Sequence, residues 1–248
     1  MLQIEHLTKM YGDVVAVDDL SMTIEDGDIF GFIGLNGAGK TTTIKAVVGI
    51  HKFEKGEILI NGVSIKDDPI ACKRQLAYIP DNPDLYDFMT GIKYLNFVAD
   101  VFGLSQKDRA DRIGKYSELL ELTSDLPSPI SSYSHGMKQK LAIISALIHE
   151  PKLMVLDEPF VGLDPKATFT LKEQFRAMVE AGACIFFSTH GLEVAQNLCN
   201  KIAIIQKGVL LECGPIDEIV GKQSLESVFL ALTDEDAAAP QASAGAQR

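Results

Sequence analysis

The chain has 248 residues, 46% hydrophobic and 23% charged, which is typical of a globular protein with one large or two small packed cores. Its net charge of -11 argues against nucleic acid as the main partner, because binding a phosphate backbone requires a basic face. The longest apolar run starts at Leu141 and is too short to span a membrane, and the N-terminus lacks a signal peptide's apolar region, so the sequence predicts a cytoplasmic protein.

The first sixty-odd residues predict mainly β structure. Residues 2–11 and 17–28 alternate between apolar and polar side chains, as half-exposed strands do. Residues 56–65 contain Asn61-Gly62 between two alternating apolar runs, which is a strong hairpin signal. We therefore expect a β-rich N-terminal subdomain.

A glycine-rich loop at residues 34–41, with the sequence GLNGAGKT, matches the phosphate-loop pattern. An apolar segment expected to be a buried strand precedes it, and a helix predicted to end at Gly49 follows. Glycines let successive backbone amides face phosphate oxygens, while Lys40 reaches the terminal phosphates and Thr41 is placed to hold Mg2+. The sequence therefore predicts a binding site for a nucleoside triphosphate.

The second half of the chain predicts helices followed by parallel strands. Residues 83–150 have apolar side chains at three- and four-residue steps, which indicates a helical subdomain. Two near-continuous apolar runs, 152–159 and 183–190, flank a predicted crossover helix, so the fold class is α/β. We expect a short helix within 221–233 and a disordered tail at 234–248. The four cysteines, Cys72, Cys184, Cys199 and Cys213, are widely spaced and predict buried free thiols rather than a metal site.

Two carboxylates, Asp157 and Glu158, end the first of these apolar runs, where they could reach a bound magnesium nucleotide. We interpret Asp157 as an Mg2+ ligand, directly or through water, and Glu158 as the group that orients or deprotonates the attacking water. An acidic strand end without function is the alternative. His190 ends the next apolar run and could contact the γ-phosphate or the attacking water, although an isolated histidine is more often structural.

Five motifs in order make the chain resemble the ATP-binding cassette (ABC) family over roughly residues 1–220. Residues 34–41 resemble the Walker A loop, 133–138 the signature motif LSGGQ, Asp157-Glu158 the Walker B pair, 162–165 (GLDP) the D-loop, and His190 the switch histidine. The resemblance implies a P-loop ATPase fold with a mixed sheet core, an N-terminal antiparallel β subdomain and an α-helical subdomain.

The resemblance also implies roles for individual residues in binding ATP and Mg2+. Tyr11 matches the aromatic residue that stacks on adenine, although a core aromatic is the alternative. Ser134 and Gly136 match the signature contacts, and they could bind an anion at a helix start, although an ordinary N-cap is the alternative. Expected nucleotide contacts are Tyr11, Gly34, Leu35, Asn36, Gly37, Ala38, Gly39, Lys40, Thr41, Thr42, Ser134 and Gly136; expected metal ligands are Thr41 and Asp157; expected catalytic residues are Glu158, His190 and Asp81.

Two departures from the family pattern affect this prediction. Asp81 stands where the family usually has glutamine, which changes how Mg2+ or the attacking water would be held. His135 and Met137 replace the usual glycine and glutamine of the signature motif, leaving the Ser134 and Gly136 contacts in place.

In this family the signature motif completes the nucleotide site of a second ATPase subunit, so the resemblance implies a homo- or heterodimer in which ATP bridges two copies. It further implies the ATPase subunit of an exporter, peripheral on the cytoplasmic face of the membrane, with integral-membrane subunits on separate chains. A non-transport ATPase that assembles a cytosolic complex is the alternative. A regulatory module without turnover conflicts with the presence of Glu158 and His190.

Overall fold

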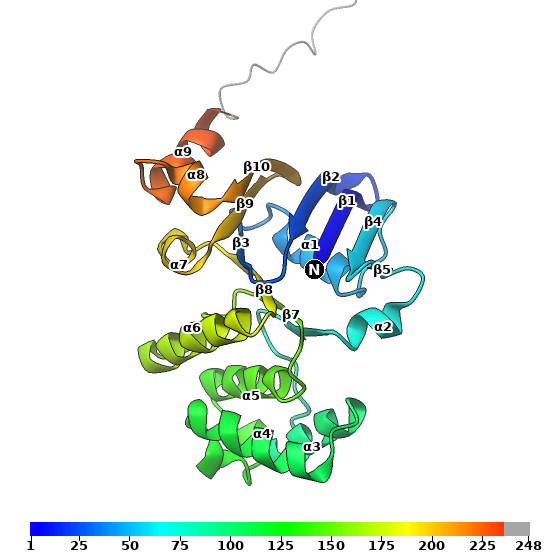
Figure 1. The fold of residues 1–248 in the computed structure, drawn as a ribbon, viewed down its shortest axis with the longest axis vertical. Coiled ribbons are helices and arrows are strands. Elements are labelled where there is room, and N and C mark those ends of the chain that lie inside the picture. Colours follow the sequence, from blue (N-terminus) through cyan, green and yellow to red (C-terminus); the bar gives the residue numbers. More distant parts are fainter. Residues whose placement is uncertain (236–248) are drawn as a thin grey trace, which may run out of the picture.

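The computed structural model describes residues 1–235, which fold into two β-sheets and a set of helices (Figure 1). The N-terminal sheet is antiparallel, in the order β2-β1-β4-β5. Its strands are β1 (Leu2–Tyr11), β2 (Val14–Ile24), β4 (Lys55–Ile60) and β5 (Val63–Ser64). Asn61 and Gly62 both have positive φ and form the predicted tight turn between β4 and β5.

The central sheet is mixed, in the order β10-β9-β3-β8-β7-β6. Every neighbouring pair is parallel except β9 with β10, which forms an antiparallel edge hairpin. Its strands are β3 (Ile29–Ile33), β6 (Leu76–Ile79), β7 (Leu153–Asp157), β8 (Cys184–Thr189), β9 (Lys201–Gln206) and β10 (Val209–Pro215). This arrangement confirms the predicted α/β class with a mixed sheet core and an antiparallel N-terminal sheet.

The helices cover the central sheet or extend beyond it. They are α1 (Lys40–Val47), α2 (Pro69–Lys73), α3 (Gly91–Val101), α4 (Gln106–Leu119), α5 (His135–Leu147), α6 (Pro165–Glu180), α7 (Leu192–Leu198), α8 (Ile216–Val220) and α9 (Leu225–Glu235), with 3-10 turns at Thr123–Asp125 and Ile130–Ser132. In Figure 1, α3, α4 and α5 form a helical lobe below the sheets, with α6 above α5, and α5 packs against β6 of the central sheet. Residues 236–248, most of the tail predicted to be disordered, lie outside the described part of the chain.

The central sheet separates two hydrophobic cores, which is why its strands are apolar on both faces. Phe30 and Phe32 of β3 belong to a core shared with α1 and the antiparallel sheet. Ile29 and Ile33 of the same strand belong to a second core, which includes α5 and α6. Alternate side chains of a strand point to opposite faces, so a strand buried on both faces has no polar side.

Polar caps set where the longer helices begin. Thr90, Ser105, Ser134 and Asp164 each accept a hydrogen bond from a backbone amide in the first turn of α3, α4, α5 and α6, respectively. The Asp164 cap is followed by a proline at the first helical position, where its fixed φ and missing N–H cost nothing. These caps therefore fix the residues at which α3, α4, α5 and α6 begin.

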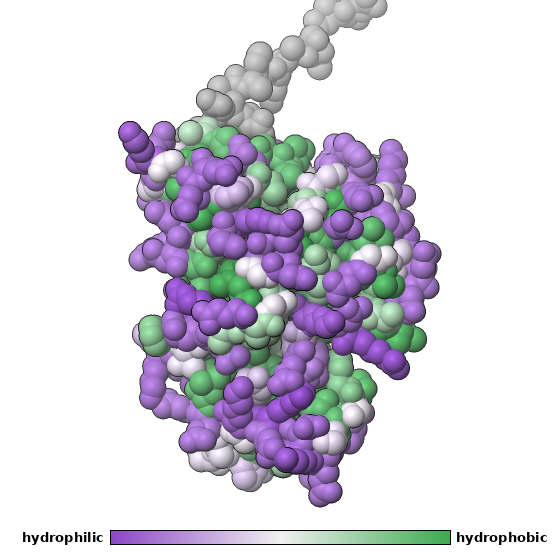
Figure 2. Space-filling view, viewed as in Figure 1, coloured by the Kyte–Doolittle hydropathy of each residue, from purple (hydrophilic) through white to green (hydrophobic). Residues whose placement is uncertain are grey.

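Cys72, Cys184 and Cys199 are buried free thiols, as predicted, but the prediction was wrong for Cys213. Cys213 is exposed because β10 is the edge strand of the central sheet. On the face shown in Figure 2, hydrophilic side chains cover most of the surface and apolar ones gather in small separate areas. No helix among residues 1–235 is long and apolar enough to cross a membrane.

Candidate nucleotide site

The glycine-rich loop joins β3 to α1 and has a conformation that glycine alone adopts readily. Gly37 and Gly39 have φ values of 83° and 108°, in the region that side chains disfavour. A Cβ atom on Gly39 would lie 2.7 Å from the Ala16 carbonyl oxygen, and one on Gly34 would lie 2.5 Å from that of Ile205. The loop therefore packs tightly against neighbouring backbone and leaves its amides and the start of α1 open to an anion.

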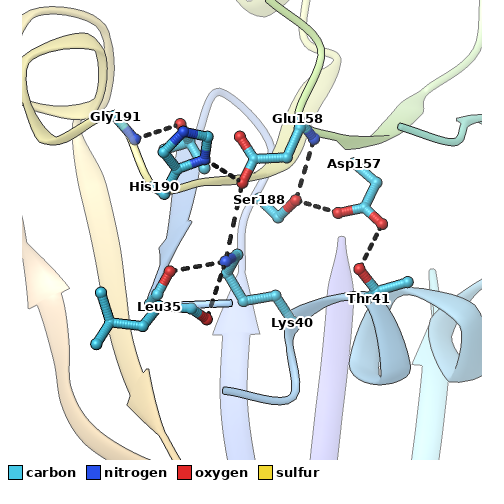
Figure 3. Close-up of polar contacts among 10 residues, drawn as sticks. Leu35, Lys40, Thr41, Asp157, Glu158, Ser188, His190 and Gly191 are labelled. Carbon is cyan, nitrogen blue, oxygen red and sulfur yellow. Dashed lines mark hydrogen bonds and ion pairs between the residues drawn. The ribbon is translucent and has the colours of Figure 1, made fainter. Parts of the chain in front are cut away.

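Lys40 lies inside this loop with its side chain buried. Its Nζ donates to the carbonyl oxygens of Gly34 at 2.7 Å and Leu35 at 3.3 Å, and lies 3.8 Å from Glu158 Oε1 (Figure 3). Burial lowers the pKa of Lys40, while the carboxylates of Glu158 and Asp157 oppose that shift. An incoming phosphate would replace carbonyl partners with a charged one, which is a stronger interaction for a buried ammonium.

Asp157 ends β7 and is held by two hydroxyl groups. Thr41 Oγ1 donates to Asp157 Oδ2 at 2.7 Å, and Ser188 Oγ donates to the other carboxylate oxygen (Figure 3). Asp157 and Ser188 are neighbours in the parallel pairing of β7 with β8, so the sheet register itself brings them together. The Thr41 hydroxyl and the Asp157 carboxylate thus lie side by side, and oxygen donors of this kind are the ligands that Mg2+ prefers.

Ser188 is a site residue that the sequence analysis missed. Its hydroxyl also accepts a hydrogen bond from the Glu158 backbone amide at 3.1 Å, so a single side chain orients both acidic residues. The available signal was its place two residues before His190 at the end of an apolar strand, but a serine in a strand has no distinctive spacing.

Glu158 and His190 form a hydrogen-bonded pair. His190 Nδ1 and Glu158 Oε1 are 2.9 Å apart, and His190 is exposed. Glu158 has a φ of 48°, a left-handed backbone conformation that residues with side chains rarely adopt. The ends of β7 and β8 therefore bring a carboxylate and an imidazole together beside Lys40, where they can act on a water molecule at the terminal phosphate.

A hollow of about 230 Å3 gathers most of the predicted site residues. Its lining includes Leu35, Asn36, Gly37, Gly39, Lys40, Thr41, Thr42, Asp81, Asp157 and Glu158, together with Ala16. Ala38 is buried beneath the loop. Asp81 therefore shares the hollow with the two strand-end carboxylates, and burial together with Asp157 and Asp81 raises the pKa of nearby Tyr78 to about 12.

Three of the predicted contacts lie away from this hollow. Tyr11 is 46% exposed, which excludes a core role, and it packs edge-on against His51 with Lys9 above its ring. Ser134 and Gly136 are not among the described residues that line the hollow; Ser134 caps α5 in the helical lobe. The described residues therefore place the glycine-rich loop at this hollow, and Ser134 and Gly136 apart from it at the start of α5, where the Ser134 hydroxyl accepts a hydrogen bond from the Met137 amide.

Comparisons with known proteins agree with this geometry. The family model described as ABC transporter matches residues 17–161. The ABC-type transporter ATP-binding protein EcsA of Bacillus subtilis is 35% identical, with 96% of this chain and 98% of that protein covered. The Nod factor export ATP-binding protein I of Cupriavidus metallidurans is 32% identical, with 90% of this chain and 74% of that protein covered.

A solved structure described as the ATP binding subunit of an ABC transporter superposes with a TM-score of 0.91 at 35% identity, covering 94% of this chain and 99% of that one. Fold, loop, strand-end acids and sequence relatives point to the same family. The chain belongs to the ABC transporter family and is one of its ATP-binding, ATP-hydrolysing subunits.

Proposed function

We propose that this chain powers an exporter whose membrane-spanning subunits are separate chains, and that it works as a dimer closed by ATP. The observation that carries this proposal is the separation of the two elements expected to bind phosphate: most of the loop at residues 34–41 lines the hollow, while Ser134 and Gly136 do not. A second copy, identical or related, would bring its Ser134 and Gly136 to the exposed side of the bound triphosphate. Hydrolysis would remove the bridging phosphate and let the copies separate.

The residues around the hollow have distinct roles in this proposal. Lys40 and the loop amides bind the phosphates, and Thr41 and Asp157 are the residues that would hold Mg2+, which supplies charge neutralisation when bound. Glu158 orients or deprotonates the attacking water, and His190 positions that carboxylate. Asp81, which lines the same hollow, helps to hold the metal or the water, and Tyr11 stacks on the adenine ring.

The dimer is tested by separating binding from hydrolysis. Glu158→Gln should retain ATP binding but not turnover, so we expect it to accumulate as an ATP-linked dimer in size-exclusion chromatography. Lys40→Ala should stay monomeric with ATP because it lacks the buried ammonium that receives the phosphate. Elution that is independent of nucleotide for both variants would refute the mechanism.

A surface on the helical lobe supports docking of a membrane subunit. Tyr86 packs against Phe88, Tyr94 and Phe97, with ring centroids 5.7 to 6.0 Å apart, and Phe88 is 86% exposed. Tyr94 also lines a hollow of about 320 Å3 between α3, α5 and β6, which continues this surface inward. An exposed aromatic cluster next to an apolar hollow is typical of a site where a partner's side chains insert.

The hollow also contains polar atoms that a partner could satisfy. The Tyr78 hydroxyl and His149 Nδ1 both belong to residues lining it, are buried, and have no hydrogen-bond partner among the described residues. Buried polar groups normally have partners. We infer that a short helix from the membrane subunit, apolar on one face with a polar group at its centre, occupies this hollow on the cytoplasmic side of the membrane.

Co-purification tests this partner. Replacing Phe88 and Phe97 with serine should abolish recovery of an integral-membrane protein from detergent extracts, while ATP hydrolysis by the isolated chain should persist. Phe169→Ser is the matched control, since Phe169 is 65% exposed but lies on α6, outside this surface. Recovery of a soluble complex alone would favour the assembly role instead.

Export rather than import is supported by the relatives. The Cupriavidus metallidurans relative is a Nod factor export ATP-binding protein, and the substrate of this chain's own transporter depends on its membrane subunits. Vesicles containing the complete complex should move substrate away from the side that receives ATP. Transport toward the ATP side would contradict the direction.

A further inference from the structure

His135 of the signature motif lies directly against the D-loop of the same chain. Gly162 has a φ of 79°, and a Cβ atom built on it would lie 2.4 Å from His135 Cδ2 and 2.9 Å from His135 Nε2. A Cβ atom on Gly136 would lie 2.8 Å from the Gly162 carbonyl oxygen. The imidazole ring and the backbone at Gly162 therefore touch with no room for another carbon atom.

Gly162 belongs to the segment 159–164, which connects Glu158 to α6. Two further contacts join α5 to this segment. The fully buried Gln139 donates through Nε2 to the Pro159 carbonyl oxygen at 3.3 Å. Lys140 Nζ lies 3.1 Å from Asp164 Oδ2, and Asp164 also caps α6. The first turns of α5 thus hold the segment at its beginning, middle and end.

The segment leaves the site directly from Glu158. Val161 N donates to the Glu158 carbonyl oxygen at 3.2 Å, and Phe160 packs edge-on against Phe175 and Phe187 in the core. The segment has few ways to move without moving either Glu158 or the start of α5, because close-packed contacts transmit displacement. A shift at Gly162 is therefore shared with Glu158 on one side and with Ser134 and Gly136 on the other.

We propose that His135 is a positioning residue: its ring sets the spacing between the start of α5 and the D-loop, and so aligns the Ser134–Gly136 phosphate contacts with Glu158 of the same chain. A glycine at position 135 would leave this gap unfilled. In the dimer, Ser134 and Gly136 of one copy contact the nucleotide held by the phosphate loop of the other copy. Binding of that phosphate would act through His135 and Gly162 on Glu158 of the first copy, which serves the second nucleotide site. This inference rests on the proposed function, because Ser134 and Gly136 meet phosphate only in the dimer.

The test adds a methyl group at the contact between His135 and Gly162, and then removes the His135 side chain to make room for it. Gly162→Ala puts a methyl group into the His135 ring, and we expect kcat for ATP to fall at least ~10-fold, because displacements of about 1 Å in a catalytic site cost up to ~100-fold. KM for ATP should change by a smaller factor than kcat, since the phosphate loop is untouched. Adding His135→Gly to Gly162→Ala should restore most of the lost kcat by making room for the methyl group.

Gly182→Ala is the matched control for backbone strain. Gly182 has a φ of 91°, but nothing lies within 4 Å of a Cβ atom built there. Gly182→Ala should lower the thermal unfolding midpoint through backbone strain alone, and should leave kcat near the wild-type value. This comparison separates strain at a positive φ from contact with His135.

Two results would overturn the proposal. One is a Gly162→Ala enzyme with wild-type kcat, and the other is a loss of kcat that His135→Gly does not relieve. Failure of the proposed function looks different, because the Glu158→Gln variant would then form no ATP-linked dimer.

Discussion

His149 should make the stability of this protein depend on pH. It follows α5 and stacks on Phe102, with ring centroids 3.7 Å apart and planes within 1° of parallel. Burial, with a smaller contribution from Arg112, lowers the pKa of His149 from its ordinary value of 6.5 to about 4. The unfolded chain therefore takes up this proton at a higher pH than the folded chain does.

The sign and size of the effect follow from these two pKa values. The contribution of His149 to the free energy of unfolding is fully present above pH 6.5. It is lost as the pH falls toward 4, because protonation then favours the unfolded state. Between about pH 7.5 and about pH 5 the linkage relation gives a loss of about 2 kcal/mol in the free energy of unfolding.

The perturbation is His149→Phe, which keeps an aromatic ring on Phe102 but cannot bind a proton. Urea unfolding of both proteins at both pH values gives the change in the free energy of unfolding on acidification for each protein. The contributions of the other titrating groups cancel when the two changes are subtracted. We expect the variant to lose about 2 kcal/mol less than the wild type on acidification. Equal losses in the two proteins would refute the assignment of this pH dependence to His149.

Three further predictions concern the site and the core. Ser188→Ala should lower kcat roughly 10-fold, measured by phosphate release, because Asp157 loses a partner that orients it; unchanged kcat would contradict this role. Phe175→Ala should lower the free energy of unfolding by about 3–5 kcal/mol in urea titrations, since this ring is fully buried in the core, and a loss below about 1 kcal/mol would count against the packing described. Tyr11→Ala should weaken ATP binding about 5- to 100-fold in equilibrium titrations through loss of stacking, whereas Tyr86→Ala, equally exposed but in the helical lobe, should not.

The sequence was most informative where local chemistry and structure coincide. The glycine-rich loop, the Asn61-Gly62 turn and the doubly buried strands followed from backbone freedom and apolar runs, which act over a few residues. Asp157 and Glu158 were found because they end such a strand.

Ser188 and the Cys213 exposure could not be found in the same way. Ser188 matters because β8 pairs with β7 in a particular register, and Cys213 is exposed because β10 happens to be an edge strand. Register and strand order depend on residues far apart in sequence. The contact of His135 with Gly162 is of this kind too, since only the folded chain places the signature motif against the D-loop.

The left-handed backbone at Glu158 has a consequence for how such a protein can change over time. Holding a glutamate at this φ costs about 1–2 kcal/mol relative to glycine, so Glu158→Gly would make the chain harder to unfold while removing the carboxylate that acts on water. Heat tolerance and turnover thus oppose each other at a single position. A laboratory selection for thermal resistance alone would favour inactive chains with glycine at position 158. Only a simultaneous selection for ATP hydrolysis would keep the glutamate there.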